Sequence, residues 1–108
     1  MMRRFSILLF LIFWGGAASA AEGIFVVGIG KLSCSNWQSS PAKIKEGKAW
    51  LFGAWTGLNS INPKNRLVGS KSDARGLAAE VKRLCTDKPS LSLHEATLLA
   101  YRAMAEGR

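Results

Sequence analysis

The side chains best suited to covalent or metal chemistry in this sequence are Cys34, Cys85 and His94. A catalytic cysteine needs a base that takes the thiol proton and a further group that orients this base. The cysteines form no CxxC pair, and His94 is the only histidine. His94 has no cysteine or carboxylate at metal-ligand spacing, and we expect it to be exposed to solvent. We therefore predict a protein without enzyme activity, with no catalytic residue, no cofactor and no metal.

The first twenty residues have the features of a secretory signal peptide. Met1 to Arg4 is a short positive segment, Phe5 to Trp14 is almost entirely apolar, and Ala18 to Ala20 fits an A-x-A cleavage site. The alternative is a membrane anchor, but the apolar segment is shorter than the roughly 20 residues that a spanning helix needs. We predict cleavage after Ala20 and export to the periplasm by the general secretory route. Residues 21–108 then form a single domain without a stable membrane anchor.

Export changes the interpretation of the two cysteines. In an oxidising compartment, the simplest state of two cysteines is one disulfide, here between Cys34 and Cys85. This bond closes a loop of about 50 residues, which the chain-entropy model equates with about 4 kcal/mol of stability. A domain of this size has a small core, so such a bond contributes a large part of its stability. A catalytic thiol is the alternative.

The charge of the chain indicates the kind of partner that it attracts. The 108 residues contain 15 Lys and Arg against 7 Asp and Glu, a formal net charge of +8. A basic surface steers anionic partners toward the protein. The basic residues are scattered without interleaved aromatic residues, so we predict no nucleic-acid binding. Three of them, Lys64, Arg66 and Lys71, lie in a polar stretch from Ser60 to Lys71 that we interpret as a long loop, either functional or a solvated linker.

The rest of the mature chain has helical patterns. The apolar, glycine-punctuated stretch from Glu22 to Ser33 predicts a short strand or an extended arm. Cys34 and Trp37 share one side of a predicted helical turn. Ser40 and Pro41 open a central helix that we expect to end near Asn59.

Three small residues in this central helix, Gly53, Ala54 and Gly57, predict a track for the close approach of another helix. Ser72 is the expected cap of a helix that ends near Asp87, and Ser92 with Glu95 is a capping box for the last helix. The sequence therefore predicts an all-α fold: a small bundle of about four helices, held by one disulfide, with a short extended N-terminal arm.

Several motifs together resemble a known family. They are Cys34-Ser-Asn-Trp37, the run from Ala49 to Asn59, and Val81 to Cys85 followed by Pro89. The pattern resembles the Rap/Tai immunity proteins of type VI secretion and, more distantly, the acid chaperones HdeA and HdeB. The resemblance covers roughly residues 33–102. It implies a helical protein that neutralises a peptidoglycan-cleaving effector enzyme, with homodimers common in the family.

The alternative that this resemblance implies is an acid-activated chaperone for unfolded client proteins. Seven acidic residues are a modest supply for an acid-triggered switch, so we prefer the immunity-like function. In either case the partner is a protein. The predicted partner-binding residues are Trp55, Asn59, Lys64, Asn65, Arg66 and Lys71.

Overall fold

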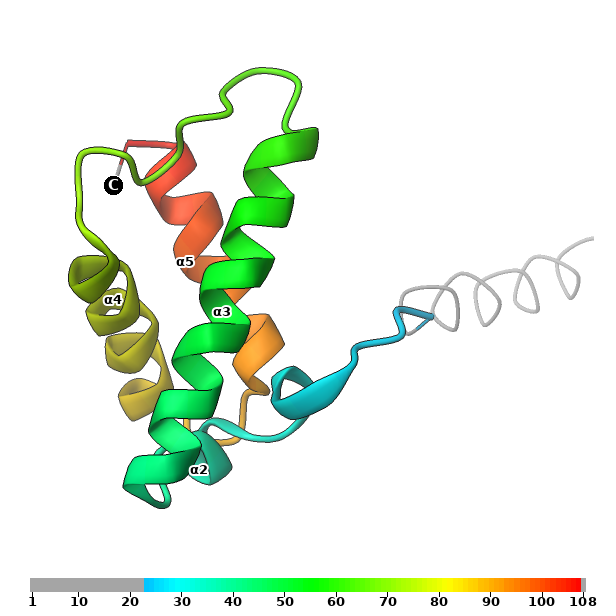
Figure 1. Cartoon of the computed structure of the whole chain (residues 1–108), viewed down its shortest axis with the longest axis vertical. Helices are drawn as coiled ribbons and strands as arrows, with labels where there is room; N and C mark the ends of the chain where they lie inside the picture. Colours follow the sequence, from blue (N-terminus) through cyan, green and yellow to red (C-terminus); the bar gives the residue numbers. More distant parts are fainter. Residues whose placement is uncertain (1–22, 108) are drawn as a thin grey trace, which may run out of the picture.

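The computed structural model describes residues 23–107 of the chain, and the predicted signal peptide lies outside them. Within this range the protein is all-α, as predicted. Figure 1 shows α3 running through the middle of the molecule, with α4 beside it, α5 behind it and α2 at its foot. The elements in order are a 3-10 helix η1 (Gly28–Lys31), α2 (Cys34–Trp37), α3 (Pro41–Ile61), α4 (Ala74–Asp87) and α5 (Leu93–Ala105).

The central helix α3 begins where the sequence predicts and ends two residues later. The Ser40 hydroxyl accepts a hydrogen bond from the backbone N–H of Lys43 at 3.1 Å, and Pro41 occupies the first turn. The helix passes the predicted end at Asn59 and stops at Ile61, because Asn62 is extended before Pro63. A residue that precedes proline is disfavoured in helical conformation.

The next two helices differ in how well their caps were predicted. Asp73, and not the predicted Ser72, caps α4, since its carboxylate accepts a hydrogen bond from the N–H of Gly76 at 2.8 Å. A carboxylate suits this position because it also faces the positive end of the helix dipole. For α5 the predicted capping box is confirmed: Ser92 accepts from the Glu95 N–H, and Glu95 accepts from the Ser92 N–H.

The predicted disulfide between Cys34 and Cys85 is confirmed. Its Cα atoms are 5.2 Å apart, and both cysteines are buried. The bond joins α2 to α4. Two backbone hydrogen bonds hold the same segment to the start of α5, from the Cys34 N–H to the Leu91 carbonyl at 2.7 Å and from the Leu93 N–H to the Leu32 carbonyl at 2.9 Å. Because both sulfurs are in the bond, neither cysteine is a free thiol.

The N-terminal arm packs on α3 and does not form a strand within the described residues. Residues 23–27 have no regular structure, and Gly28–Lys31 is a turn of 3-10 helix. The indole N–H of Trp50 donates a hydrogen bond to the Val27 carbonyl at 2.7 Å. The ring of Trp50 also covers Gly30 so closely that a Cβ there would overlap it.

The predicted small-residue track on α3 is wrong for the described part of the chain. Gly53 and Gly57 face open space, with no atom of another element within 4 Å of where a Cβ would stand. The close contact lies on a different face of α3, at buried Gly47. There the Trp37 ring fills the space that a Cβ would need. The Trp37 indole donates to the Ile44 carbonyl at 3.0 Å, which fixes the ring in this place. Helical periodicity identifies a small-residue face but does not identify the group that packs on it.

These glycines give a matched pair of substitutions. We expect Gly47→Ala to lower the free energy of unfolding by about 1 to 3 kcal/mol, because the new methyl group overlaps the fixed Trp37 ring. We expect Gly53→Ala to raise it by about 0.4 to 1 kcal/mol, because the methyl group enters solvent and the unfolded chain loses freedom. Urea unfolding followed by circular dichroism measures both values. Equal losses in the two variants would contradict the assigned packing.

Candidate partner-binding site

The connection between α3 and α4, residues 62–73, is anchored in the core at Val68. Val68 is 3% exposed, and its backbone is fully paired with side chains of α3. Its carbonyl accepts hydrogen bonds from the Trp55 indole at 2.9 Å and from the Asn59 amide at 3.2 Å. Its N–H donates to Asn59 Oδ1 at 3.2 Å. A buried loop residue needs such partners, because its backbone groups have lost water.

Tyr101 extends this network to α5. Its hydroxyl donates to Asn59 Oδ1 at 2.8 Å and accepts from the Asn62 amide at 3.0 Å. The Tyr101 ring also packs edge-on against Trp55, with ring centroids 5.2 Å apart. The network therefore joins α3, α5 and the loop through groups that are mostly shielded from solvent, where hydrogen bonds hold their geometry well.

Two asparagines shape the exposed part of the loop. Asn62 Oδ1 accepts hydrogen bonds from the N–H groups of Lys64 and Asn65, at 2.9 and 3.0 Å. Asn65 Oδ1 accepts from the Leu67 N–H at 2.8 Å. Side-chain to backbone bonds of this kind fix tight turns. Gly69, with φ of +83°, then turns the chain toward α4 in a conformation that other residues rarely adopt.

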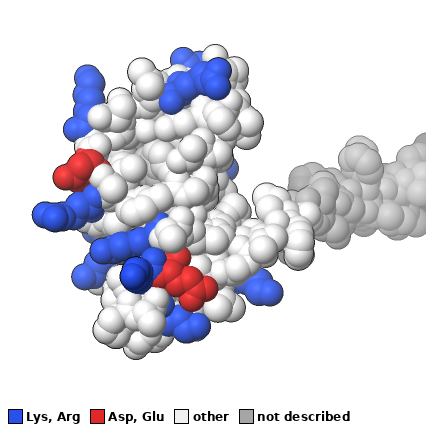
Figure 2. Space-filling view, in the orientation of Figure 1, with Lys and Arg blue, Asp and Glu red and all other residues white. Residues whose placement is uncertain are grey.

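This fixed loop displays the three predicted basic residues, Lys64, Arg66 and Lys71. All three are exposed, and within residues 23–107 none forms an ion pair with a carboxylate. Leu67 lies among them and is 69% exposed. Figure 2 shows basic side chains at the end of the molecule over which the loop passes in Figure 1. The loop thus offers an anionic partner a positive surface with one apolar contact.

The structure divides the predicted site residues into two groups. Trp55 and Asn59 point inward and hold the loop, so they offer little surface to a partner, and Asn65 is engaged with the loop backbone. Sequence reasoning missed Val68 and Tyr101. The signal for them was weak: an apolar residue within a polar loop, and one tyrosine on the inner face of α5.

A second surface that sequence reasoning missed is an apolar groove beside the arm. It has a volume of about 460 Å³, and no Lys, Arg, Asp or Glu lines it. Phe25 is 87% exposed at its edge. His94, which we expected to be exposed, is half-buried here. Its ring lies edge-on to the Trp50 ring, with the ring centroids 6.2 Å apart. The lining residues are Ile24, Phe25, Val26, Val27, Trp50, Ala54, Gly57, Leu58, Ile61, His94, Thr97 and Leu98.

Residues 23–107 contain no group of three or more His, Cys, Asp or Glu side chains that could hold a metal ion. None of the helices in this range has the length and apolar character of a membrane span. Comparison of the chain with protein-family models, curated proteins and solved structures gives no match. The resemblance to the Rap/Tai family therefore rests on the sequence motifs alone.

The polar network predicts how loop variants behave. We expect Asn59→Ala to lower the free energy of unfolding by about 2 to 3 kcal/mol, because it leaves the Val68 N–H and the Tyr101 O–H without an acceptor. Hydrogen exchange at the Val68 amide should accelerate strongly. Asn65→Ala is the matched control, since it removes one exposed bond and should change stability by less than about 1 kcal/mol. A Val68 amide that keeps its protection in Asn59→Ala would show that the network does not hold the loop.

Proposed function

We propose that this chain is an exported binding protein without enzyme activity, and specifically an immunity protein that neutralises a peptidoglycan-cleaving effector in the periplasm. The observation that carries the proposal is the loop at 62–73, which Val68 anchors in the core and which displays Lys64, Arg66 and Lys71. The motif resemblance and the predicted signal peptide support the same function.

The loop has the physical properties that an enzyme inhibitor needs. Its shape is fixed before binding, so association does not have to order it. Its charge is opposite to that of an active site built from carboxylates, such as the paired acids of most glycoside hydrolases. A positive surface speeds the encounter with such a site. Arg66 can also form two parallel hydrogen bonds with one carboxylate.

The proposal is tested with the peptidoglycan-cleaving enzymes encoded beside this gene, each expressed in the periplasm. We expect this chain to prevent lysis by one of them. Lys64→Glu combined with Arg66→Glu should abolish protection while leaving the melting temperature within a few degrees, because both side chains are exposed. Lys45→Glu combined with Lys88→Glu is the control with the same charge change. No neighbouring enzyme of this class, or equal protection by both double variants, would contradict the proposal.

The acid-chaperone alternative requires carboxylates whose ionisation holds the fold closed. Among the described residues, the hydrogen bond from Arg83 lowers the pKa of Glu80 below its ordinary value. Both side chains lie on the outer surface of α4, where an ion pair contributes little to stability. This pair is too weak for an acid switch, which is why the immunity-like function is the one that we propose.

The lowered pKa of Glu80 predicts a small pH dependence with a definite sign. Because the pKa in the folded protein is below the ordinary value of 4.5, the pair stabilises the fold above that pH and is lost as pH falls through the folded value. We expect Glu80→Gln to melt a few degrees below the unmodified chain at pH 7. The difference should shrink as pH falls through the folded pKa and vanish once the carboxyl is protonated in both states. Arg83→Gln should behave in the same way, and a difference that does not shrink as the solution is acidified would refute the linkage.

A further inference from the structure

A small cleft between α3 and α4 lies apart from the loop and from the apolar groove. Its volume is about 190 Å³. Ile44, Ala78 and Ala79 give it apolar walls, and Lys48, Arg75 and Lys82 supply three cations around it. Trp37 and Gln38 complete the lining.

The helical spacing places the cations on opposite sides of the apolar residues. Arg75 and Lys82 are seven residues apart on α4, which is two turns or about 10 Å, with Ala78 and Ala79 between them. On α3, Lys48 follows Ile44 by one turn, so both residues lie on the same side of that helix. A ligand in the cleft would meet positive charge from both helices and an apolar surface between them.

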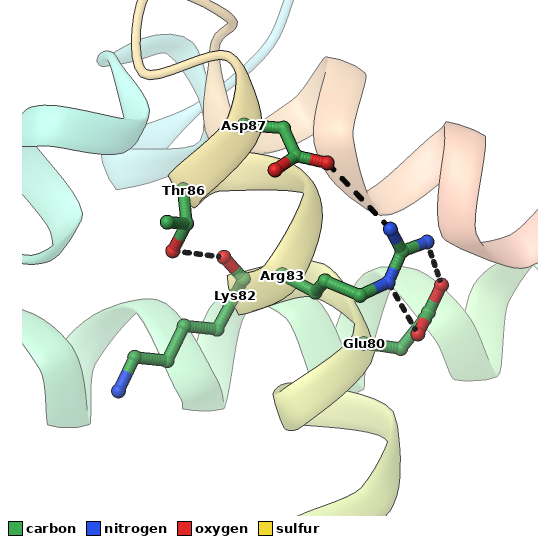
Figure 3. Close-up of polar contacts among 5 residues, drawn as sticks. All are labelled: Glu80, Lys82, Arg83, Thr86 and Asp87. Carbon is green, nitrogen blue, oxygen red and sulfur yellow. Dashed lines mark hydrogen bonds and ion pairs between the residues drawn. The ribbon is translucent and has the colours of Figure 1, made fainter.

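The acidic residues of α4 leave these three cations unneutralised. Arg83 binds Glu80 through two hydrogen bonds, at 2.7 and 3.2 Å, and lies 3.6 Å from Asp87. Figure 3 shows Arg83 turned toward both carboxylates, while the side chain of Lys82 points away from them. Within residues 23–107, Lys48, Arg75 and Lys82 form no ion pair.

Among the described residues, no ion pair ties these three exposed cations to a carboxylate, so they are available to a ligand with negative charges. We propose that the cleft binds an acidic segment of a partner protein, with one apolar side chain in the cleft and carboxylates paired with Lys48, Arg75 and Lys82. The inference is independent of the proposed function, since no residue of the 62–73 loop takes part.

The cleft favours a peptide over other anionic ligands. Its volume is below the roughly 300 to 1,000 Å³ of small-molecule sites, so it suits a single side chain. Nucleic acid would need an aromatic face for stacking, but Trp37 is 1% exposed and its indole is bonded to Ile44. A membrane-binding surface would add protruding apolar side chains. None of the strongly exposed large apolar residues of the described chain lines this cleft.

The test uses the mature chain labelled with ¹⁵N and a short synthetic peptide in which two glutamates stand on each side of a single leucine. We expect amide shifts that cluster at Ile44, Lys48, Ala78 and Ala79. Lys48→Gln combined with Lys82→Gln should weaken binding at least about tenfold, because two of the three paired cations are lost. Lys31→Gln combined with Lys88→Gln is the matched control, with the same charge change outside the cleft, and should change affinity by less than about twofold.

Three results would overturn the inference. The first is no shift at about 1 mM peptide. The second is equal weakening in the two double variants, which would show non-specific attraction to a basic surface. The third is binding to phosphatidylglycerol vesicles through Lys48 and Lys82 without binding to the peptide, which would assign the cleft to lipid headgroups. Circular dichroism confirms that the variants are folded, as expected for substitutions of exposed side chains.

Discussion

The disulfide between Cys34 and Cys85 is the constraint on which the rest of the structure depends. It ties a single helical turn, α2, to α4, and α2 would be too short to hold its place by its own hydrogen bonds. With α2 fixed, Trp37 is pressed onto Gly47 of the central helix, and the chain just before α2 pairs with the start of α5. The disulfide thereby holds α2 in the place where it contacts α3, α4 and α5.

The loop at 62–73 depends on a second constraint, which is polar. An apolar core could bury the Val68 side chain but could not satisfy its backbone, and Trp55 with Asn59 does so. Because these partners are on α3, the loop is held to the central helix at Val68. The exposed cations of the loop then stand on a rigid support, which is the basis for proposing an inhibitor of an enzyme.

The sequence was sufficient for the features that depend on local chemistry. Helix caps at Ser40 and Ser92 and the apolar periods predict the all-α bundle, and the predicted export signal favours its disulfide. The sequence was insufficient where the packing depends on which groups meet in space. Gly53 and Gly47 look alike in a helical pattern, yet only Gly47 has a tryptophan packed on it. Trp55 and Asn59 looked suited to a partner, whereas their hydrogen-bonding groups are used inside the molecule.

The most direct test is the thermal melt of oxidised residues 21–108 beside their Cys34→Ser, Cys85→Ser double variant. The loop that the bond closes predicts a loss of about 4 kcal/mol. For a domain of this size, that corresponds to a fall of about 20 °C or more in the melting temperature. Equal melting temperatures for the two chains, or two free thiols in the oxidised protein, would show that the bond does not hold the bundle together.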